Sequence, residues 1–125
     1  MQPVYLQGGA VHVSWADAGR SLTDLIFHGV SAALRDAGIG MQKIDSVVLS
    51  AHDVVDGRSL SSMVTAPAAG AYLRDEIRIV GDGMNAVSLG AARLVAGESE
   101  LTMIAAWGRA SEGDFTRTSL AMMDP

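Results

Sequence analysis

A glycine turn, Gly81-Asp82-Gly83, is the part of this sequence most easily placed in a reaction site. It lies between a short apolar run and a long apolar segment, which is typical of a turn from a strand into a helix. The stretch GDGMNA has the dinucleotide-binding spacing G-x-G-x-x-A, in which the helix N-terminus binds the pyrophosphate. However, it follows the third predicted strand rather than the first, and Asp82 would place a carboxylate against the pyrophosphate. We therefore favour a structural turn.

Asp82 and His52 are the side chains here that could transfer a proton. Asp82 could act as a general base near the sheet edge, or its carboxylate could cap the following helix. His52 and Asp53 follow an apolar run, with Asp56 and Arg58 close behind, so this group could serve proton transfer or form a solvated turn with an internal ion pair. The three histidines lack the spacing of metal ligands, so we expect no metal site (His12, His28, His52). We expect His28 to pack within its helix.

Apolar periodicity and turn residues predict the elements that position these groups. Ser21 is a good N-cap for the first helix, and Gly38 is a suitable glycine to end it. The predicted strands are 3–9, 44–51, 77–80 and 101–107, and the predicted helices are 21–38, 59–67 and 85–96. The segment from about residue 109 has no clear periodicity, so we expect a loop.

The alternation of strands and helices with short connections predicts an α/β fold. We expect a mostly parallel sheet with helices on both faces. Residues 85–96 are apolar nearly all round, which predicts a buried central helix. In such sheets ligands bind beyond the carboxyl ends of the strands, where His52, the glycine turn and residues 108–112 are expected to lie.

Length, charge and composition narrow the classes of function. A chain of 125 residues fits one domain, and a net charge of -5 argues against nucleic acid as a partner. No apolar run is long enough to cross a membrane, and the first residues do not resemble a secretory signal. The absence of cysteine excludes disulfides and thiolate metal sites, and it fits a cytoplasmic protein.

Two longer stretches resemble a known family when they are taken with the glycine turn between them. They are ALRDAGIGMQKIDSVVLSA, residues 33–51, and LVAGESELTMIAAWGRASEGD, residues 94–114. Their order and spacing resemble the N-terminal half of a thiolase-superfamily protein, closest to the sterol-carrier-protein-type thiolase-like branch. The resemblance extends from about Val4 to Glu112. It implies that residues 1–125 are a thiolase-like half-fold whose site is incomplete without a second half.

The resemblance also implies where a nucleophile would stand. In thiolases the third strand ends in a nucleophilic Cys, three residues before a glycine. Counting back from Gly97, which matches the glycine after the central helix, places Val80 at the Cys position and Gly83 at the motif glycine. A valine has neither a lone pair nor a titratable proton, so it cannot form a thioester. We therefore assign no catalytic residue, and Asp82 and His52 stay the only candidates.

The same matching implies substrate contacts at Gly83, Met84 and Asn85, and at Ser111 in the loop after the last strand. A CoA thioester is the implied substrate or ligand, with no tightly bound cofactor. The resemblance further implies a homodimer, or a hetero-oligomer with thiolase-like chains or with zinc-ribbon or OB-fold companion chains. In the family the brief third strand pairs with its counterpart across a two-fold axis.

Two functions are compatible with these implications. In the first, the chain is expected to be a scaffold and dimerisation subunit of an acyl-CoA-handling complex, without its own nucleophilic Cys. Alternatively, it belongs to a cysteine-free thiolase-like enzyme, an aldolase or acyltransferase, that makes or breaks carbon–carbon bonds of acyl-CoA substrates with residues of a C-terminal half.

Overall fold

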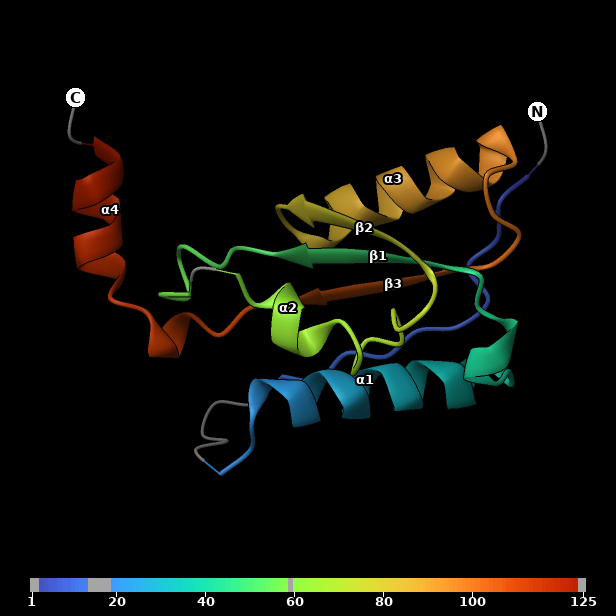
Figure 1. Ribbon diagram of the computed structural model, residues 1–125, viewed down its shortest axis with the longest axis horizontal. Coiled ribbons are helices and arrows are strands. Elements are labelled where there is room, and N and C mark those ends of the chain that lie inside the picture. Colours follow the sequence, from blue (N-terminus) through green and yellow to red (C-terminus); the bar gives the residue numbers. More distant parts are fainter. Residues whose placement is uncertain (1–2, 14–18, 59, 124–125) are drawn as a thin grey trace.

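A three-stranded parallel sheet forms the centre of the fold, with helices against both of its faces (Figure 1). The computed structural model describes residues 3–13, 19–58 and 60–123. The strands are β1 (Ser46–Ala51), β2 (Asp75–Val80) and β3 (Thr102–Trp107), in the order β2-β1-β3. β1 is buried along its whole length, as its apolar sequence predicts. The α/β class and the parallel sheet are confirmed.

Helix α1 (Leu22–Ala37) covers one face of the sheet, and both of its predicted ends are confirmed. The Ser21 side chain accepts a hydrogen bond from the backbone N of Asp24 at 3.1 Å, and Gly38 ends the helix with φ 67°. His28 is exposed on this helix, so the prediction that it packs is wrong. The core lies between α1 and the sheet, and its members include Leu22, Ile26, Val30, Val47, Leu49, Met103 and Ala105.

Helix α3 (Gly83–Ala96) lies against the opposite face. A Cβ placed on Gly90 would stand 3.0 Å from Cδ1 of Ile104 in β3, so the helix approaches the sheet closely there. Only Ala86, Gly90 and Arg93 are buried, and the Met84 side chain is 68% exposed. The prediction of a buried central helix is therefore wrong for this chain, because no described segment covers the outward face of α3.

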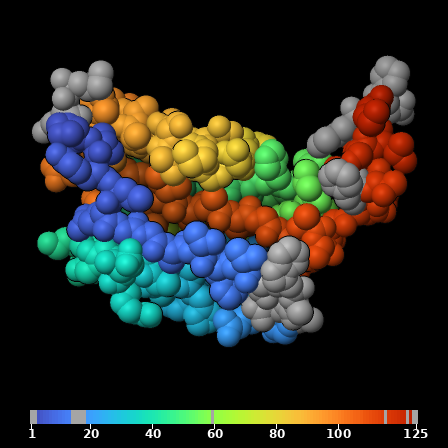
Figure 2. Space-filling view, turned by 180° about the vertical axis from the view of Figure 1, so that it is seen from behind, coloured from blue at the N-terminus to red at the C-terminus, as the bar shows by residue number. Residues whose placement is uncertain are grey.

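The first predicted strand is also wrong. Residues 3–13 contain no strand and are mostly exposed; the backbone N of Gly9 donates to the Asp36 carboxylate at 3.0 Å. Figure 2 shows this N-terminal segment along the side of the molecule, between α1 and the segments that form α3 and β3. A β-favouring run becomes a strand only when a neighbouring strand supplies its hydrogen bonds.

The connections between the strands differ from the predictions. Between β1 and β2, α2 is only Ser62–Thr65, and Ser59, its predicted start, lies outside the described residues. A 3-10 turn, η1 (Met41–Lys43), precedes β1. After β3 the predicted loop is instead η2 (Ala110–Glu112) followed by helix α4 (Phe115–Met123), which projects beyond the carboxyl ends of the strands (Figure 1).

None of the helices in the described part of the chain is long and apolar enough to cross a membrane.

Candidate functional site

A hollow of about 310 Å³ lies at the carboxyl ends of β1 and β2. After β1 the chain turns to α2, on the side of α1, whereas after β2 it turns to α3 on the opposite face (Figure 1). Neighbouring parallel strands whose connections leave in opposite directions form a crevice at which α/β proteins bind ligands. The hollow is lined by residues 52–55 after β1, by residues 78–80 of β2 and by Leu60.

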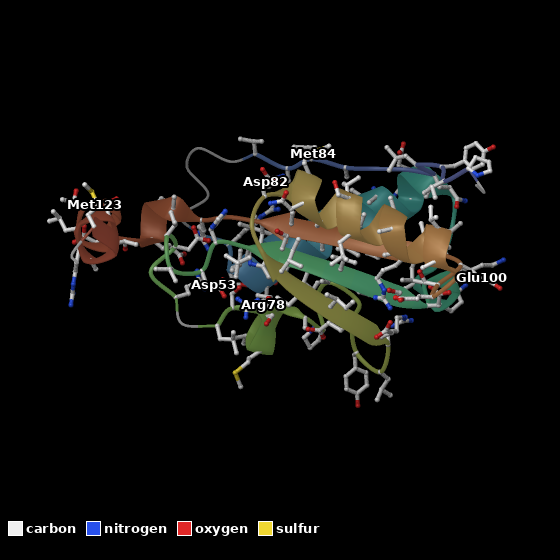
Figure 3. The ribbon with its side chains drawn as sticks, turned by 90° about the horizontal axis from the view of Figure 1, so that it is seen from above. Asp53, Arg78, Asp82, Met84, Glu100 and Met123 are labelled. Carbon is white, nitrogen blue, oxygen red and sulfur yellow. The ribbon has the colours of Figure 1, made fainter. Side chains whose placement is uncertain are left out.

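The Asp53 carboxylate links the segments that surround this hollow. The Asp53 side chain is 5% exposed, and its carboxylate accepts hydrogen bonds from the backbone N of Ser61 at 2.8 Å and from the Ser61 hydroxyl. The same carboxylate forms an ion pair with the Arg78 guanidinium of β2, and Figure 3 shows the two residues side by side. The Ser61 hydroxyl also accepts from Nε1 of Trp107 at the end of β3, at 3.1 Å. One hydrogen-bonded group therefore links the carboxyl ends of all three strands.

Burial alone would raise the pKa of Asp53, but the hydrogen bonds from Ser61 and the charge of Arg78 outweigh it and hold the pKa below its usual value. Asp53 is thus a stable carboxylate and a weak base, which suits structure better than proton transfer. The prediction of a solvated turn with an internal ion pair is wrong here. Asp53 is buried and pairs with Arg78, whereas Arg58 pairs with Glu112.

The glycine turn is held by a cap and by a buried serine. The Asp82 carboxylate accepts a hydrogen bond from the backbone N of Asn85 at 3.0 Å, so the capping role is confirmed. The Ser50 hydroxyl of β1 donates to the carbonyl oxygen of Gly81 at 2.7 Å. A Cβ on Gly83 would meet Cβ of Ala106 at 3.4 Å, an ordinary contact, so Gly83 is not needed for close packing.

Val80, at the position that the resemblance gives to the nucleophile, has a side chain that is 73% exposed. Val80 lies on β2, an edge strand, and no described segment covers the outer side of that strand. Met84 and Asn85 are exposed in the first turn of α3. Ser111 is exposed in η2, and His52 is exposed at the rim of the hollow. The structure thus brings Val80, the turn and the start of α3 together and places Ser111 in a separate loop.

That separate loop is joined to the loop after β1. The backbone N of Arg109 donates to the Asp56 carboxylate at 2.8 Å, and Arg58 forms an ion pair with Glu112. A Cβ on Gly113 would overlap the carbonyl oxygen of Val55. Sequence reasoning missed this contact between the two loops, because the pairing residues lie more than 50 positions apart and their local sequences are ordinary turns.

No three His, Cys, Asp or Glu side chains within residues 3–13, 19–58 and 60–123 are grouped so that they could hold a metal ion. Comparisons of the chain with protein-family models, with characterised proteins and with solved structures gave no match. The resemblance to thiolase-like proteins therefore stays a prediction from the sequence.

Proposed function

We propose that the chain is a scaffold and dimerisation subunit of an acyl-CoA-handling complex, without a nucleophile of its own. The observation that carries this proposal is Val80, which stands exposed at the end of β2, directly before the capped start of α3. This is where an α/β site of the thiolase type would present a thiol, and a hydrocarbon side chain cannot attack an acyl group.

The neighbouring side chains support binding rather than covalent chemistry. None of the described residues that line the hollow carries a thiol, a hydroxyl or an amine, and the His52 imidazole is exposed at its rim. The charges of Asp53 and Arg78 neutralise each other. The Asp82 carboxylate already accepts a hydrogen bond as a cap. Met84 and Asn85, in contrast, are exposed and offer an apolar and a hydrogen-bonding contact at the start of α3.

The open edge of β2 supports the dimerisation role. β2 pairs with β1 on one side only among the described residues, so its outer backbone N–H and C=O groups face away from the sheet. An uncovered edge strand promotes pairing with another chain, and antiparallel pairing of two β2 strands about a two-fold axis satisfies both edges at once. We expect a dimer in sedimentation experiments at micromolar concentration, and a 13 kDa monomer under these conditions would contradict the dimerisation role.

The acyl-CoA part is tested with the purified chain and acetyl-CoA or acetoacetyl-CoA. Intact mass is expected to show no acyl adduct, and calorimetry is expected to show saturable, reversible binding. Met84→Glu should weaken that binding about tenfold, because its carboxylate repels the phosphates of CoA. Met123→Glu is the matched control, since Met123 is exposed on α4. A covalent adduct would contradict the non-catalytic role, and absence of saturable binding would contradict the CoA ligand.

A second candidate is a cysteine-free thiolase-like enzyme that is completed by a C-terminal half. The uncovered outward face of α3 favours it, because apolar residues there are exposed as they would be if another unit packed on them (Met84, Val87, Val95). The test is coexpression with a neighbouring gene product that resembles a thiolase C-terminal half, or a zinc-ribbon or OB-fold companion. Formation or cleavage of a carbon–carbon bond by the pair, but not by either chain alone, would favour this candidate.

A further inference from the structure

Leu73 has an unusual backbone conformation for a residue with a side chain. Its φ is 56°, and it is the one residue other than glycine with a positive φ in the described part of the chain. The left-handed region is unfavourable for a side chain with a Cβ, so such residues persist only where something else holds them. The Leu73 side chain is 88% exposed and the neighbouring Tyr72 side chain 69% exposed, so burial within the chain does not compensate.

Arg74 holds this turn in place. Its guanidinium donates from Nε to the carbonyl oxygen of Ile44 at 2.8 Å, from Nη1 to that of Gly70 at 2.9 Å and from Nη2 to that of Met41 at 3.0 Å. These bonds tie the turn to the segment before β1. Tyr72 and Leu73 therefore project as a rigid apolar pair, and contacts made by a rigid pair cost little further ordering on binding.

The apolar pair belongs to a larger exposed surface along β2, on the α2 side of the sheet. A second, more open hollow of about 380 Å³ lies beside Tyr72 and Leu73, against α2 and Glu76 of β2, and the first hollow surrounds the other end of the strand. Large apolar side chains that are exposed on one side of a sheet are typical of an interaction site. The large side chains of this surface are Val54, Leu60, Met63, Tyr72, Leu73 and Val80.

We propose that two copies of the chain pair their β2 strands antiparallel, and that Tyr72 and Leu73 of each copy insert into the first hollow of the other. This inference rests on the dimerisation role proposed above and assigns the residues that determine it. The inserted pair comes just before β2, and the hollow surrounds the last residues of β2, so the two lie at opposite ends of one edge strand. Antiparallel pairing brings the start of each strand opposite the end of the other, which makes both insertions at once.

The charges and the lining of the first hollow favour a second copy of the chain as its occupant. The hollow is mostly apolar, and its Asp53–Arg78 pair is already neutral, so an apolar side chain enters it without leaving a charge unpaired. The same arrangement gives partners to the outer backbone groups of both β2 strands.

The first test changes the inserted side chain without disturbing its backbone. Asparagine and glycine tolerate a positive φ, so Leu73→Asn and Leu73→Gly keep the turn and remove the apolar contact. Each is expected to raise the dimer dissociation constant at least tenfold in sedimentation equilibrium. Leu6→Asn is the matched control, because Leu6 is 87% exposed in the N-terminal segment, away from β2, and it should leave the dimer unchanged. Wild-type dimerisation by either Leu73 variant, or a monomeric wild type, overturns the proposal.

The second test measures the arrangement itself, and the chain suits it because it contains no cysteine. Leu73→Cys and Val80→Cys are introduced together and the protein is mildly oxidised. Within one chain, residues 73 and 80 are separated by the length of β2, at least roughly 16 Å, which is too far for a disulfide. Antiparallel pairing of two β2 strands brings residue 73 of one copy close to residue 80 of the other. The double variant should become a covalent dimer, and each single variant should not. A disulfide dimer of the Leu73→Cys single variant would show that the two Leu73 positions meet each other, and it would contradict the antiparallel arrangement.

Both tests are separable from the acyl-CoA proposal. Leu73→Asn should leave acetyl-CoA binding unchanged, since the proposed CoA contacts are at the start of α3, on the opposite face of the sheet from α2 (Figure 1). If Leu73→Asn dimerises normally while acetyl-CoA binds, the insertion is wrong and the acyl-CoA role stands. If acetyl-CoA fails to bind while Leu73→Asn is monomeric, the acyl-CoA role is wrong and the insertion of Leu73 stands.

Discussion

The carboxylate of Asp53 and the guanidinium of Arg78 form an ion pair across the carboxyl ends of β1 and β2, with the carboxylate almost completely buried. Asp53 accepts two further hydrogen bonds from Ser61. The pair therefore connects the edge strand to the centre of the sheet at the place where the proposed dimer contact forms.

Asp53→Asn is expected to destabilise the fold by about 3 kcal/mol at pH 7, because it leaves the Arg78 charge without its partner in a mostly buried position. The pKa of Asp53 is lowered in the folded chain, so its contribution is complete above the usual carboxyl pKa of about 4 and is lost as the pH falls through the lowered value. The measurement is urea unfolding from pH 7 down to pH 3. The difference between wild type and variant should shrink at the acid end, and a constant difference would contradict the assignment. Glu100→Gln, at an exposed position, is the control.

Asp82→Ala tests whether this carboxylate caps α3. Loss of the hydrogen bond to the backbone N of Asn85 should lower the free energy of unfolding by about 1 kcal/mol. Asp82→Ser should restore most of that loss, because serine is also a good N-cap but cannot act as a general base. The readout is the midpoint of denaturant unfolding for the two variants. Equal destabilisation by alanine and serine would argue against a capping role.

Gly113→Ala tests the contact between the loop after β3 and the loop after β1. The φ of Gly113 is -93°, which any residue can adopt, so the substitution adds no backbone strain, but the new Cβ would overlap the carbonyl oxygen of Val55. We expect a loss of about 1–3 kcal/mol, as in other overpacked sites. Gly108→Ala is the matched control in the same loop, because a Cβ there has no heavy atom within 4 Å. The two variants are compared by thermal melting, and identical melting temperatures would show that the loops are not in contact.

The elements that could be predicted from the sequence are those whose causes are local. The ends of α1 follow from Ser21 and Gly38, which bond to backbone groups of their own helix. β1 could be predicted because its apolar run is too short for a helix, and the strand is buried along its whole length as expected. The start of α3 follows from Asp82, whose capping partner is three residues away.

Other features depend on partners far along the chain, so only the tertiary structure decides them. Residues 3–9 have the composition of a strand but obtain no neighbouring strand, and the predicted strand does not form. Asp53 is buried because Arg78 and Ser61 come to it from β2 and from the segment before α2. The exposure of Val80 depends on the strand order, which leaves β2 at the edge.

The sequence by itself therefore determined the fold class, the capped helices and the absence of a thiol, since these depend on residue type and short-range spacing. Only the tertiary structure decided which polar groups are paired, which end of β2 borders the hollow and that Leu73 projects in a left-handed conformation. The physical reason is that burial and pairing depend on which segments meet in space, and the periodicity of a single segment carries no information on its neighbours.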